Sequence, residues 1–508
     1  MKKESGICYI AGAGPGDPGL LTLRARECIE TADTIVYDYL VSPEILQWAR
    51  PDAEMIYAGK QAGNHTLTQE EINRLILERT AAGHTVLRLK GGDPYIFGRG
   101  GEEAAELAAA GLAFEVVPGI SSAIAGPAYA GIPVTHRAHN TTLTLFTGHE
   151  DPAKEEESLD FAKLAKADGT KVMLMGVGRI AALTARLIEH GANPATPVAL
   201  VRWATTPRQQ TLTGTLGDIA EKVTATGFKA PAVCIIGDVC TLRDPLNWFE
   251  NRPLFGRRIV VTRTREKAGK LGRALTSLGA APIELPLIET NPPTDLMAFG
   301  QLVRDSHTYQ WIVFTSPTGV DAFFEMFFKL YPDIRSIGGA RFAAVGPGTA
   351  ARIREHKFDV DLVADPHTAE GLVEAFRANA SVENEMILWV RPERARPVIQ
   401  KGLADLGAIV DEALAYRTVP AKADPALLES LADSNAPVDA ITFTSASTVE
   451  FFFELNPRLH PDTRLASIGP ITSAALRDHG HEPHIEASQH DIPGLVSALS
   501  DYFTTSRS

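Results

Sequence analysis

One stretch of the chain, residues 86–103, constrains the fold more than any other. It reads Val-Leu-Arg-Leu-Lys-Gly-Gly-Asp-Pro-Tyr-Ile-Phe-Gly-Arg-Gly-Gly-Glu-Glu. The opening alternation of apolar and basic residues is typical of a strand, which the Gly-Gly-Asp-Pro sequence ends before a helix rich in Ala and Glu. Glycines let the backbone approach a ligand closely, and Asp93 can accept hydrogen bonds from hydroxyls. The stretch therefore predicts a binding loop at a strand end, although Gly-Gly-Asp-Pro is also ordinary turn chemistry.

The start of the chain resembles a dinucleotide-binding motif but departs from it. A strand at 7–11 leads into Gly-Ala-Gly-Pro-Gly-Asp-Pro, in which Gly12 and Gly14 fit the first half of G-x-G-x-x-G. Asp17 stands where the third glycine belongs, and the prolines remove amide donors that a pyrophosphate needs. A following strand places Asp38 at its carboxyl end, where open α/β sheets hold ligands; a turn or helix cap is the alternative interpretation.

Strands and helices alternate through the first half, which predicts an α/β fold. Thr68 and Glu71 have capping-box spacing at the start of one helix. The charged segment 151–170 is interpreted as a solvated connection and helix. The expected strands are 7–11, 34–38, 54–60, 113–117, 171–175, 197–201 and 232–237, and the expected helices 21–32, 68–82, 102–110, 180–190 and 217–226, the last preceded by a Thr-Leu-Thr-Gly-Thr segment at 211–215.

Three segments flank the central loop in order: 12–25, 36–42 and 117–123. Together with 86–103 they resemble the S-adenosylmethionine-dependent uroporphyrinogen-III C-methyltransferases over about residues 5–245. The resemblance implies two unequal α/β lobes around a cleft that holds S-adenosylmethionine. It also implies methylation of uroporphyrinogen III at C2 and C7 to precorrin-2, toward sirohaem or cobalamin, by an enzyme that is usually a homodimer.

The same resemblance implies site residues. Asp38 matches the general base, Lys60 a proton donor, and Arg99 is a competing candidate for the base. Arg99, Glu102 and Arg137 match positions that bind substrate. The matched methyl-donor contacts are Pro15, Gly91, Gly92, Asp93, Ile96, Ser121, Ser122, Met175 and Ala204. Ala204 replaces the family's usual glycine, so its contact requires a negative φ.

A second module follows a linker at 246–256, and it repeats itself. Residues 312–320 and 441–449 are near copies, and 342–350 and 466–474 form a second pair. Each copy predicts a buried strand, a hydroxyl- or glycine-rich loop and a helix N-terminus, a geometry suited to carboxylates. The duplication predicts two similar lobes.

This half resembles uroporphyrinogen-III synthase, a two-lobed flavodoxin-like fold, over about 257–505. The expected domains are 1–245 for the methyltransferase and 257–508 for the synthase, with lobe one at 257–288 plus 418–508 and lobe two at 289–417. Tyr416 is the candidate that assists loss of the hydroxyl from hydroxymethylbilane, and a hinge tyrosine is the alternative. The candidate carboxylate ligands, with helix capping as their alternative, are Thr315, Ser316, Thr349, Ser445 and Thr472. A C-terminal half that only binds tetrapyrrole or regulates the first remains a rival.

Composition limits the partners. The chain has 508 residues and a formal net charge of −13, which argues against binding to nucleic acid, including the RNA substrates of sister methyltransferases. An anionic substrate then needs local arginines such as Arg88, Arg99 and Arg137. No apolar run reaches the ~18 residues of a membrane helix and no signal peptide is seen, so a cytoplasmic protein is expected. The four cysteines are interpreted as buried free thiols, and no metal is expected.

Overall fold

A computed structural model of the chain describes residues 6–59, 67–148, 159–262, 265–421, 423–434 and 436–505. The chain divides into two compact units. The first holds Met1–Arg258, Arg273–Pro282 and Leu499–Ser508, and the second Ile259–Gly272 and Ile283–Ala498. The expected domain and lobe boundaries stay predictions. Among the described residues, no helix is long and apolar enough to cross a membrane.

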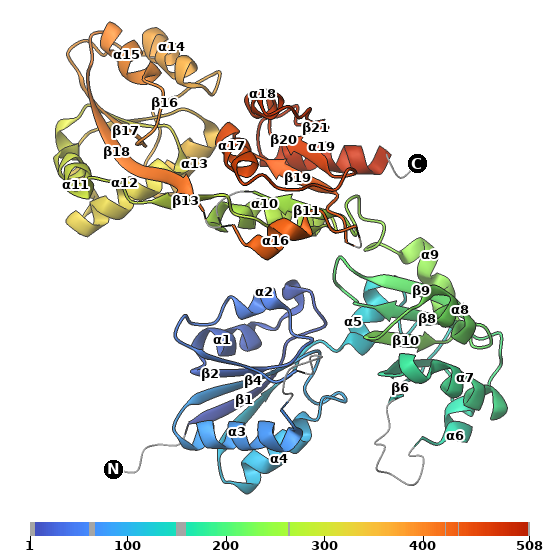
Figure 1. The fold of residues 1–508 in the computed structure, drawn as a ribbon. Helices are drawn as coiled ribbons and strands as arrows, with labels where there is room; N and C mark the ends of the chain where they lie inside the picture. The colour runs from blue at the N-terminus through green and yellow to red at the C-terminus, as the bar shows by residue number, and fades with distance from the viewer. Residues whose placement is uncertain are drawn as a thin grey trace. The chain divides into compact units, whose positions relative to one another are not determined.

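The first sheet is wholly parallel, in the order β3-β2-β4-β1-β5, and helices cover both of its faces (Figure 1). Because side chains alternate along a strand, Ile10 packs with α3 and α4 while Ala11 packs with α1 and α2. The elements are β1 (Ile7–Gly12), η1 (Pro18–Leu20), α1 (Leu23–Thr31), β2 (Thr34–Tyr37), α2 (Pro43–Leu46), β3 (Glu54–Tyr57), α3 (Gln69–Ala81), β4 (Thr85–Lys90), α4 (Gly100–Ala109) and β5 (Ala113–Val117). The expected capping box of Thr68 and Glu71 is confirmed at the start of α3.

The second sheet is mixed, in the order β6-β7-β10-β8-β9, with only β6 and β7 parallel. Its α6, α7 and α8 pack on one face and α5 on the other. The elements are α5 (Ser122–Tyr129), β6 (Leu143–Thr147), α6 (Phe161–Lys166), β7 (Thr170–Leu174), η2 (Val177–Arg179), α7 (Ile180–Glu189), β8 (Pro197–Arg202), β9 (Gln210–Thr215), α8 (Ile219–Thr226), β10 (Ala232–Ile236), η3 (Asp238–Leu242) and α9 (Arg243–Leu246). The segment 211–215, expected only as a lead into a helix, is the edge strand β9.

The C-terminal half of the chain contains two further sheets. The third has the order β12-β11-β19-β20-β21, and its β11, β19, β20 and β21 are parallel. Its elements are β11 (Arg258–Val261), α10 (Arg265–Ser277), β12 (Ala281–Glu284), α16 (Pro425–Ser430), β19 (Ala440–Phe443), α17 (Ala446–Glu454), β20 (Arg464–Ser467), α18 (Pro470–Asp478), β21 (Ile485–Glu486) and α19 (Ile492–Thr505).

The fourth sheet has the order β13-β18-β17-β14-β15-β16 and is parallel except for β13. Its elements are β13 (Ile288–Asn291), α11 (Leu296–Arg304), η4 (Asp305–Thr308), β14 (Trp311–Phe314), α12 (Pro317–Leu330), η5 (Ile334–Ile337), β15 (Arg341–Ala344), α13 (Pro347–Glu355), β16 (Leu362–Val363), α14 (Ala369–Asn379), β17 (Met386–Pro392), α15 (Val398–Asp405) and β18 (Ile409–Pro420). The predicted repeats are confirmed as strand–loop–helix units: β14 into α12, β15 into α13, β19 into α17 and β20 into α18.

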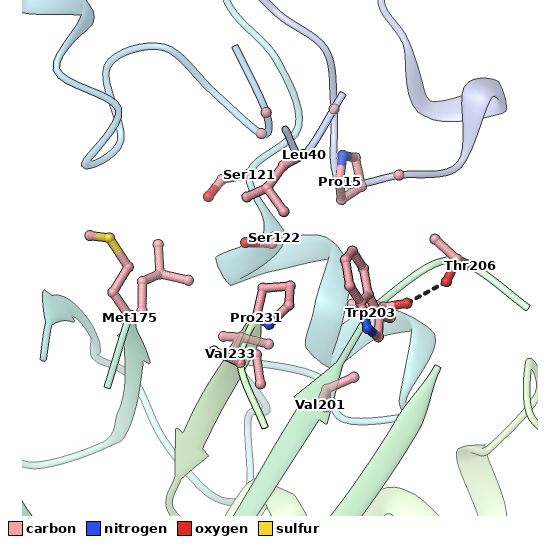
Figure 2. A pocket seen from close by; sticks show the side chains of 18 of the residues that line it. Pro15, Leu40, Ser121, Ser122, Met175, Val201, Trp203, Thr206, Pro231 and Val233 are labelled. Atoms are coloured by element: carbon pink, nitrogen blue, oxygen red, sulfur yellow. Dashed lines mark hydrogen bonds between the residues drawn. The ribbon is translucent and has the colours of Figure 1, made fainter. Parts of the chain in front are cut away.

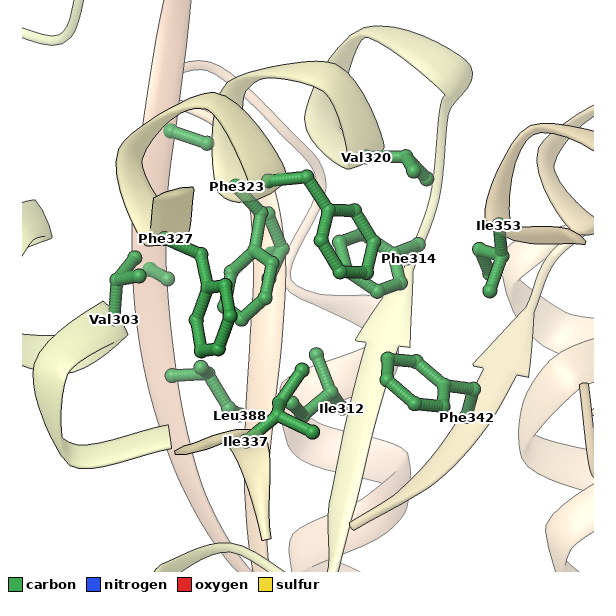
Figure 3. Packing of buried hydrophobic residues seen from close by; sticks show 14 of the residues in the cluster. Val303, Ile312, Phe314, Val320, Phe323, Phe327, Ile337, Phe342, Ile353 and Leu388 are labelled. Atoms are coloured by element: carbon green, nitrogen blue, oxygen red, sulfur yellow. The ribbon is translucent and has the colours of Figure 1, made fainter. Parts of the chain in front are cut away.

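Phenylalanines dominate the core under α12 (Figure 3). Phe323 and Phe327 lie one turn apart on the helix, are fully buried and stack on each other. Phe323 packs over Phe314 of β14, which in turn stacks on Phe342 of β15. Phe314 and Phe323 meet edge to face with their ring centroids 5.5 Å apart. This core fixes the start of α12 against the end of β14, where Thr315 and Ser316 lie.

Candidate active site

A cavity of about 740 Å³ lies between the two sheets of the first unit. Its upper wall in Figure 2 comes from loops at the carboxyl ends of β1, β2, β4 and β5, and its lower wall from loops beside β7, β8 and β10. Carboxyl strand ends are where open α/β sheets bind ligands. The residues around the cavity are Gly14, Pro15, Gly16, Tyr39–Pro43, Gly91–Asp93, Ile96–Gly98, Ser121, Ser122, Leu174, Met175, Val177, Gly178, Val201, Trp203, Ala204, Thr206, Arg208 and Ala230–Val233.

All nine residues expected to contact a methyl donor line this one cavity. Ala204 is among them, and its φ meets the requirement that its contact places on an alanine. Its neighbours Trp203 and Thr205 have φ of 47° and 70°, whereas the φ of Ala204 is not positive. Alanine therefore occupies the glycine position without backbone strain. That these nine residues bind the donor stays a prediction.

Four glycines bring the strand-end loops into backbone contact. A Cβ on Gly119 would lie 2.2 Å from the carbonyl oxygen of Gly92 and 2.7 Å from the Cα of Gly12. The amide of Gly92 donates to the carbonyl of Gly14 at 2.7 Å, which joins the central loop to the first one. Gly12 and Gly119 must lack a Cβ for this approach, and Gly92 has a φ of 70° that favours glycine.

We expect Gly119→Ala to destabilise the first unit by about 1–3 kcal/mol, because the atoms it would displace are backbone and cannot rotate away. Thermal unfolding measures the loss. Gly101→Ala is the matched control, since a Cβ on Gly101 would meet no atom within 4 Å. Equal melting temperatures for the two variants would show that the loops tolerate a Cβ at Gly119.

Asp93 fixes the shape of the central loop. Its Oδ1 accepts from the amides of Tyr95 at 2.8 Å and Ile96 at 3.1 Å, and its Oδ2 accepts from the amide of Gly119 at 3.0 Å. A carboxylate that accepts several backbone amides is strongly held. Asp93 thus ties the loop after β4 to the loop after β5, and its remaining lone pairs are available to a ligand hydroxyl.

Left-handed backbone conformations gather at the cavity. Phe97, Met175 and Trp203, all of which line it, have φ of 54°, 57° and 47°. Bulky residues rarely adopt such angles, and when they do the position is commonly part of a functional site. No sequence pattern indicated these angles. It could have suggested Tyr39 and Leu40, which directly follow Asp38 at a predicted strand end and also line the cavity.

Asp38, whose side chain is 29% exposed, belongs to a cluster of four charges beside the cavity, and the other three members are buried. Its Oδ1 lies 2.6 Å from Nη2 of Arg88, whose Nε donates to Oε1 of Glu103 at 3.0 Å. The same oxygen of Glu103 accepts from Nζ of Lys90 at 2.9 Å and from Nε2 of Gln69 at 3.1 Å. Burial, opposed by nearby carboxylates, lowers the pKa of Lys90. The carboxylates of Asp38 and Glu103 thus balance the positive charges of Arg88 and Lys90.

This cluster corrects the expectation that Arg88 is available to an anionic substrate. Its side chain is 3% exposed and already binds two carboxylates. Glu103 reaches it because residues 100, 103, 104 and 107 form the buried face of α4. Arg88 therefore holds Asp38 in place instead of meeting substrate.

The other charged candidates lie on the surface or beyond the described residues. Arg99 and Glu102 are half exposed and form an ion pair at 2.7 Å. Its hydrogen bond with Glu102 raises the pKa of Arg99, so this guanidinium is a poor proton acceptor. Arg137 is exposed in the loop between α5 and β6. Lys60 lies outside the described residues.

In the C-terminal half, Tyr416 and Ser316 form a pair. Tyr416 of β18 is 9% exposed, and its hydroxyl lies 2.9 Å from Oγ of Ser316. Ser316 is the N-cap of α12, where its Oγ accepts from the amide of Gly319 at 3.1 Å. Burial raises the pKa of Tyr416. The phenol is therefore held protonated at a helix N-terminus.

The remaining hydroxyl candidates sit at equivalent places in the repeats. Ser445 caps α17 as Ser316 caps α12, and it accepts from the amide of Thr448. Thr349 and Thr472 are each the third residue of their helix, after Gly-Pro starts, and both are buried. Thr315 directly precedes Ser316. Capping is thus observed for the two serines, and binding of carboxylates stays a prediction for all five.

Two different protein families match the two halves of the chain. Residues 8–220 match the Tetrapyrrole (Corrin/Porphyrin) Methylases, and residues 269–497 match Uroporphyrinogen-III synthase HemD. A protein of Ruminiclostridium josui described as Porphyrin biosynthesis protein HemD is 37% identical over 98% of both chains. The chain belongs to the family of proteins that join a tetrapyrrole methylase to a uroporphyrinogen-III synthase.

Relatives of the methylase part alone are closer in sequence. A Methanosarcina barkeri protein described as S-adenosyl-L-methionine-dependent uroporphyrinogen III methyltransferase is 52% identical, over 48% of this chain and 96% of its own. A solved uroporphyrin-III C-methyl transferase of Thermus thermophilus, complexed with S-adenyl homocysteine, is 38% identical over 47% of this chain and all of its own, with a TM-score of 0.41.

The two matches of this fused methylase–synthase divide the candidate residues between them. The methylase match contains Asp38, the buried charge cluster and the cavity wall up to Arg208, and Ala230–Val233 follow it closely. The synthase match contains Tyr416, Ser316 and the other hydroxyl candidates. Each half therefore carries its own candidate site.

Proposed function

We propose that this chain is a bifunctional tetrapyrrole enzyme. Its methylase half transfers methyl groups from S-adenosylmethionine to C2 and C7 of uroporphyrinogen III, giving precorrin-2 for sirohaem or cobalamin. Its synthase half makes uroporphyrinogen III from hydroxymethylbilane. The observation that carries the proposal is the single cavity that collects all nine expected donor contacts next to Asp38.

The cavity suits S-adenosylmethionine in size and chemistry. A volume of about 740 Å³ lies in the range that holds one drug-sized molecule. Glycine backbone at Gly91 and Gly92 offers close approach, and Asp93 offers acceptors for hydroxyls. Apolar and aromatic side chains fill most of the remaining wall. A bound S-adenosylmethionine supplies an electrophilic methyl group on a sulfonium.

Asp38 is the group best placed to manage the proton. Attack by a pyrrole carbon leaves positive charge on the ring system, and loss of a proton from that system restores neutrality. The proton of such a cation is weakly held, so a carboxylate is a sufficient acceptor. Arg88 holds the Asp38 carboxylate in one orientation. Arg88 is in turn held by Glu103.

Substrate carboxylates are proposed to bind at the exposed cations. Uroporphyrinogen III carries eight carboxylates, and a guanidinium binds such groups in bidentate geometry. Arg99 now pairs with Glu102, and both are half exposed, so a substrate carboxylate competes with Glu102 for Arg99. Arg137 is a second exposed guanidinium of the methylase half.

In the synthase half, Tyr416 is proposed to donate the proton with which the hydroxyl of hydroxymethylbilane leaves as water. Its raised pKa keeps the phenol protonated, as a donor requires. The Oγ of Ser316 already accepts from the amide of Gly319, so the hydroxyl proton of Ser316 is free to point at Tyr416. The phenolic proton of Tyr416 is then available for donation to the substrate.

We expect Tyr416→Phe to lower the rate of type III product formation about 10²-fold or more, because proton donation in the transition state is lost. The assay counts uroporphyrinogen isomers formed from hydroxymethylbilane. Tyr331→Phe is the control: its hydroxyl donates to the carbonyl of Arg304 at 2.8 Å on the surface, and its removal leaves the rate unchanged. A Tyr416→Phe enzyme of full activity would leave Tyr416 with a packing role only.

The methylase assignment is tested by supplying uroporphyrinogen III and methyl-labelled S-adenosylmethionine to the purified chain. Dimethylated product supports it, and absence of labelled tetrapyrrole refutes it. A homodimer is also proposed, as is usual for this class of methyltransferase. Light scattering of the purified chain decides between one copy and two.

A further inference from the structure

Among the described cavity residues that come from the second sheet and its loops, only Trp203 is aromatic. It directly follows β8. Figure 2 shows its ring across the cavity from Met175, with Pro231 between them and Val233 and Val201 lower down. Nothing in the proposed chemistry of methyl transfer uses this ring. Its position calls for a binding role.

The backbone at Trp203 is strained and firmly held. A φ of 47° is unfavourable for a large L-residue, and asparagine tolerates it far better. The carbonyl of Trp203 accepts from Oγ1 of Thr206 at 2.7 Å, and the amide of Thr205 donates to Oε1 of the buried Gln209 at 2.9 Å. Oγ1 of Thr205 accepts from the amide of Asp17 at 3.0 Å. Strain that is held by so many contacts is typical of a functional site.

Two neighbours fix the plane of the indole. The guanidinium carbon of Arg208 lies 4.4 Å from the ring centroid, over one face. The ring of Tyr39, from the first sheet's side of the cavity, meets the indole edge to face at 6.2 Å. With Arg208 and Tyr39 in place, the indole is a flat, oriented wall of the cavity, suited to stacking on a planar ligand ring.

The charges of the cavity wall indicate which kind of planar ring stacks on the indole. Among the described lining residues, Asp93 and Arg208 alone are charged, and Arg208 already covers the indole. One such guanidinium cannot neutralise the eight carboxylates of a tetrapyrrole. A nucleoside carries a planar base without charge, and its ribose hydroxyls suit Asp93.

We infer that Trp203 stacks on the adenine ring of the bound methyl donor and is a determinant of its affinity. This inference rests on the proposed function, because it assumes that the cavity holds S-adenosylmethionine. The strained backbone at 203 is the means by which the chain presents the indole to the cavity.

Trp203→Asn tests the inference, with calorimetric titration of S-adenosylhomocysteine and of adenosine as probes. Loss of a base–aromatic stack corresponds to about 5- to 150-fold weaker binding. We expect that loss for both probes. The melting temperature of the unliganded variant stays within about 4 °C of the parent, because relief of strain offsets the lost ring contacts. Trp203→Phe, which keeps a flat ring, binds both probes with intermediate affinity.

Trp248→Phe is the matched control. Trp248 also carries an arginine over its ring, Arg252 at 4.7 Å, but it is not among the cavity residues. Its substitution leaves both affinities unchanged, and adenosine still quenches indole fluorescence in this variant but not in Trp203→Asn. Unchanged binding to Trp203→Asn overturns the inference, as does a loss seen with S-adenosylhomocysteine but not with adenosine. If the parent chain itself binds neither probe, the proposed function fails instead.

Discussion

Asp38→Asn is expected to lower the rate of methyl transfer to uroporphyrinogen III by about 10²- to 10⁴-fold, the contribution typical of a positioned proton acceptor. The amide keeps the shape of the carboxylate and one oxygen for Arg88, so binding of S-adenosylhomocysteine changes little. Single-turnover transfer of labelled methyl measures the rate. Calorimetry measures the affinity.

Asp52→Asn is the matched control for Asp38→Asn. Asp52 lies in the turn before β3, is 75% exposed and pairs with Arg50, so its neutralisation leaves methyl transfer intact. Arg99 offers the competing proton acceptor. Because its pKa is raised, Arg99 is expected to bind substrate instead of accepting a proton. Arg99→Leu is therefore expected to raise KM for uroporphyrinogen III more than it lowers kcat. Full activity of the Asp38→Asn enzyme would show that another residue accepts the proton.

Glu103→Ala is expected to cost about 3–5 kcal/mol of unfolding free energy, because it leaves Arg88 and Lys90 buried with one carboxylate between them. Urea unfolding of the chain, followed by a probe of the first unit, measures the loss. Freed from Glu103, Arg88 also loses its fixed position beside Asp38. The methyl-transfer rate therefore falls in whatever fraction of the variant remains folded.

Glu102→Ala serves as the stability control on the same helix. Glu102 is also paired with an arginine, but both side chains are 56% exposed, and such pairs contribute about 1 kcal/mol or less. The contrast isolates burial as the cause. Equal losses for the two neighbours would show that the cluster around Glu103 is hydrated and that its charges are individually tolerated.

The cavity was largely predictable because its features are local in sequence. Glycine-rich loops after apolar strands identify strand ends, and parallel strands bring those ends together at one edge of a sheet. Pro15, Gly91 and Ser121 could therefore be expected to meet, although they lie far apart in the chain. The repeats of the second half were likewise visible as similar strings of residues.

Other parts depend on tertiary contacts that no short pattern encodes. The pairing of Arg88 with Glu103 requires that α4 lie against β4 with one particular face. Trp203 lines the cavity with a left-handed backbone, an angle that propensity argues against for tryptophan. The strand β9 was overlooked because its residues, Gln210–Thr215, are mostly small and polar, as befits a sheet edge.

One incubation tests the bifunctional account most directly. The purified chain receives hydroxymethylbilane and methyl-labelled S-adenosylmethionine, and the tetrapyrrole isomer and its methyl count are determined. The account predicts a type III product with two methyl groups, which Tyr416→Phe reduces at the cyclisation step and Asp38→Asn at the methylation step. A chain that methylates added uroporphyrinogen III but forms none from hydroxymethylbilane would contradict the account and make the C-terminal half a binding module.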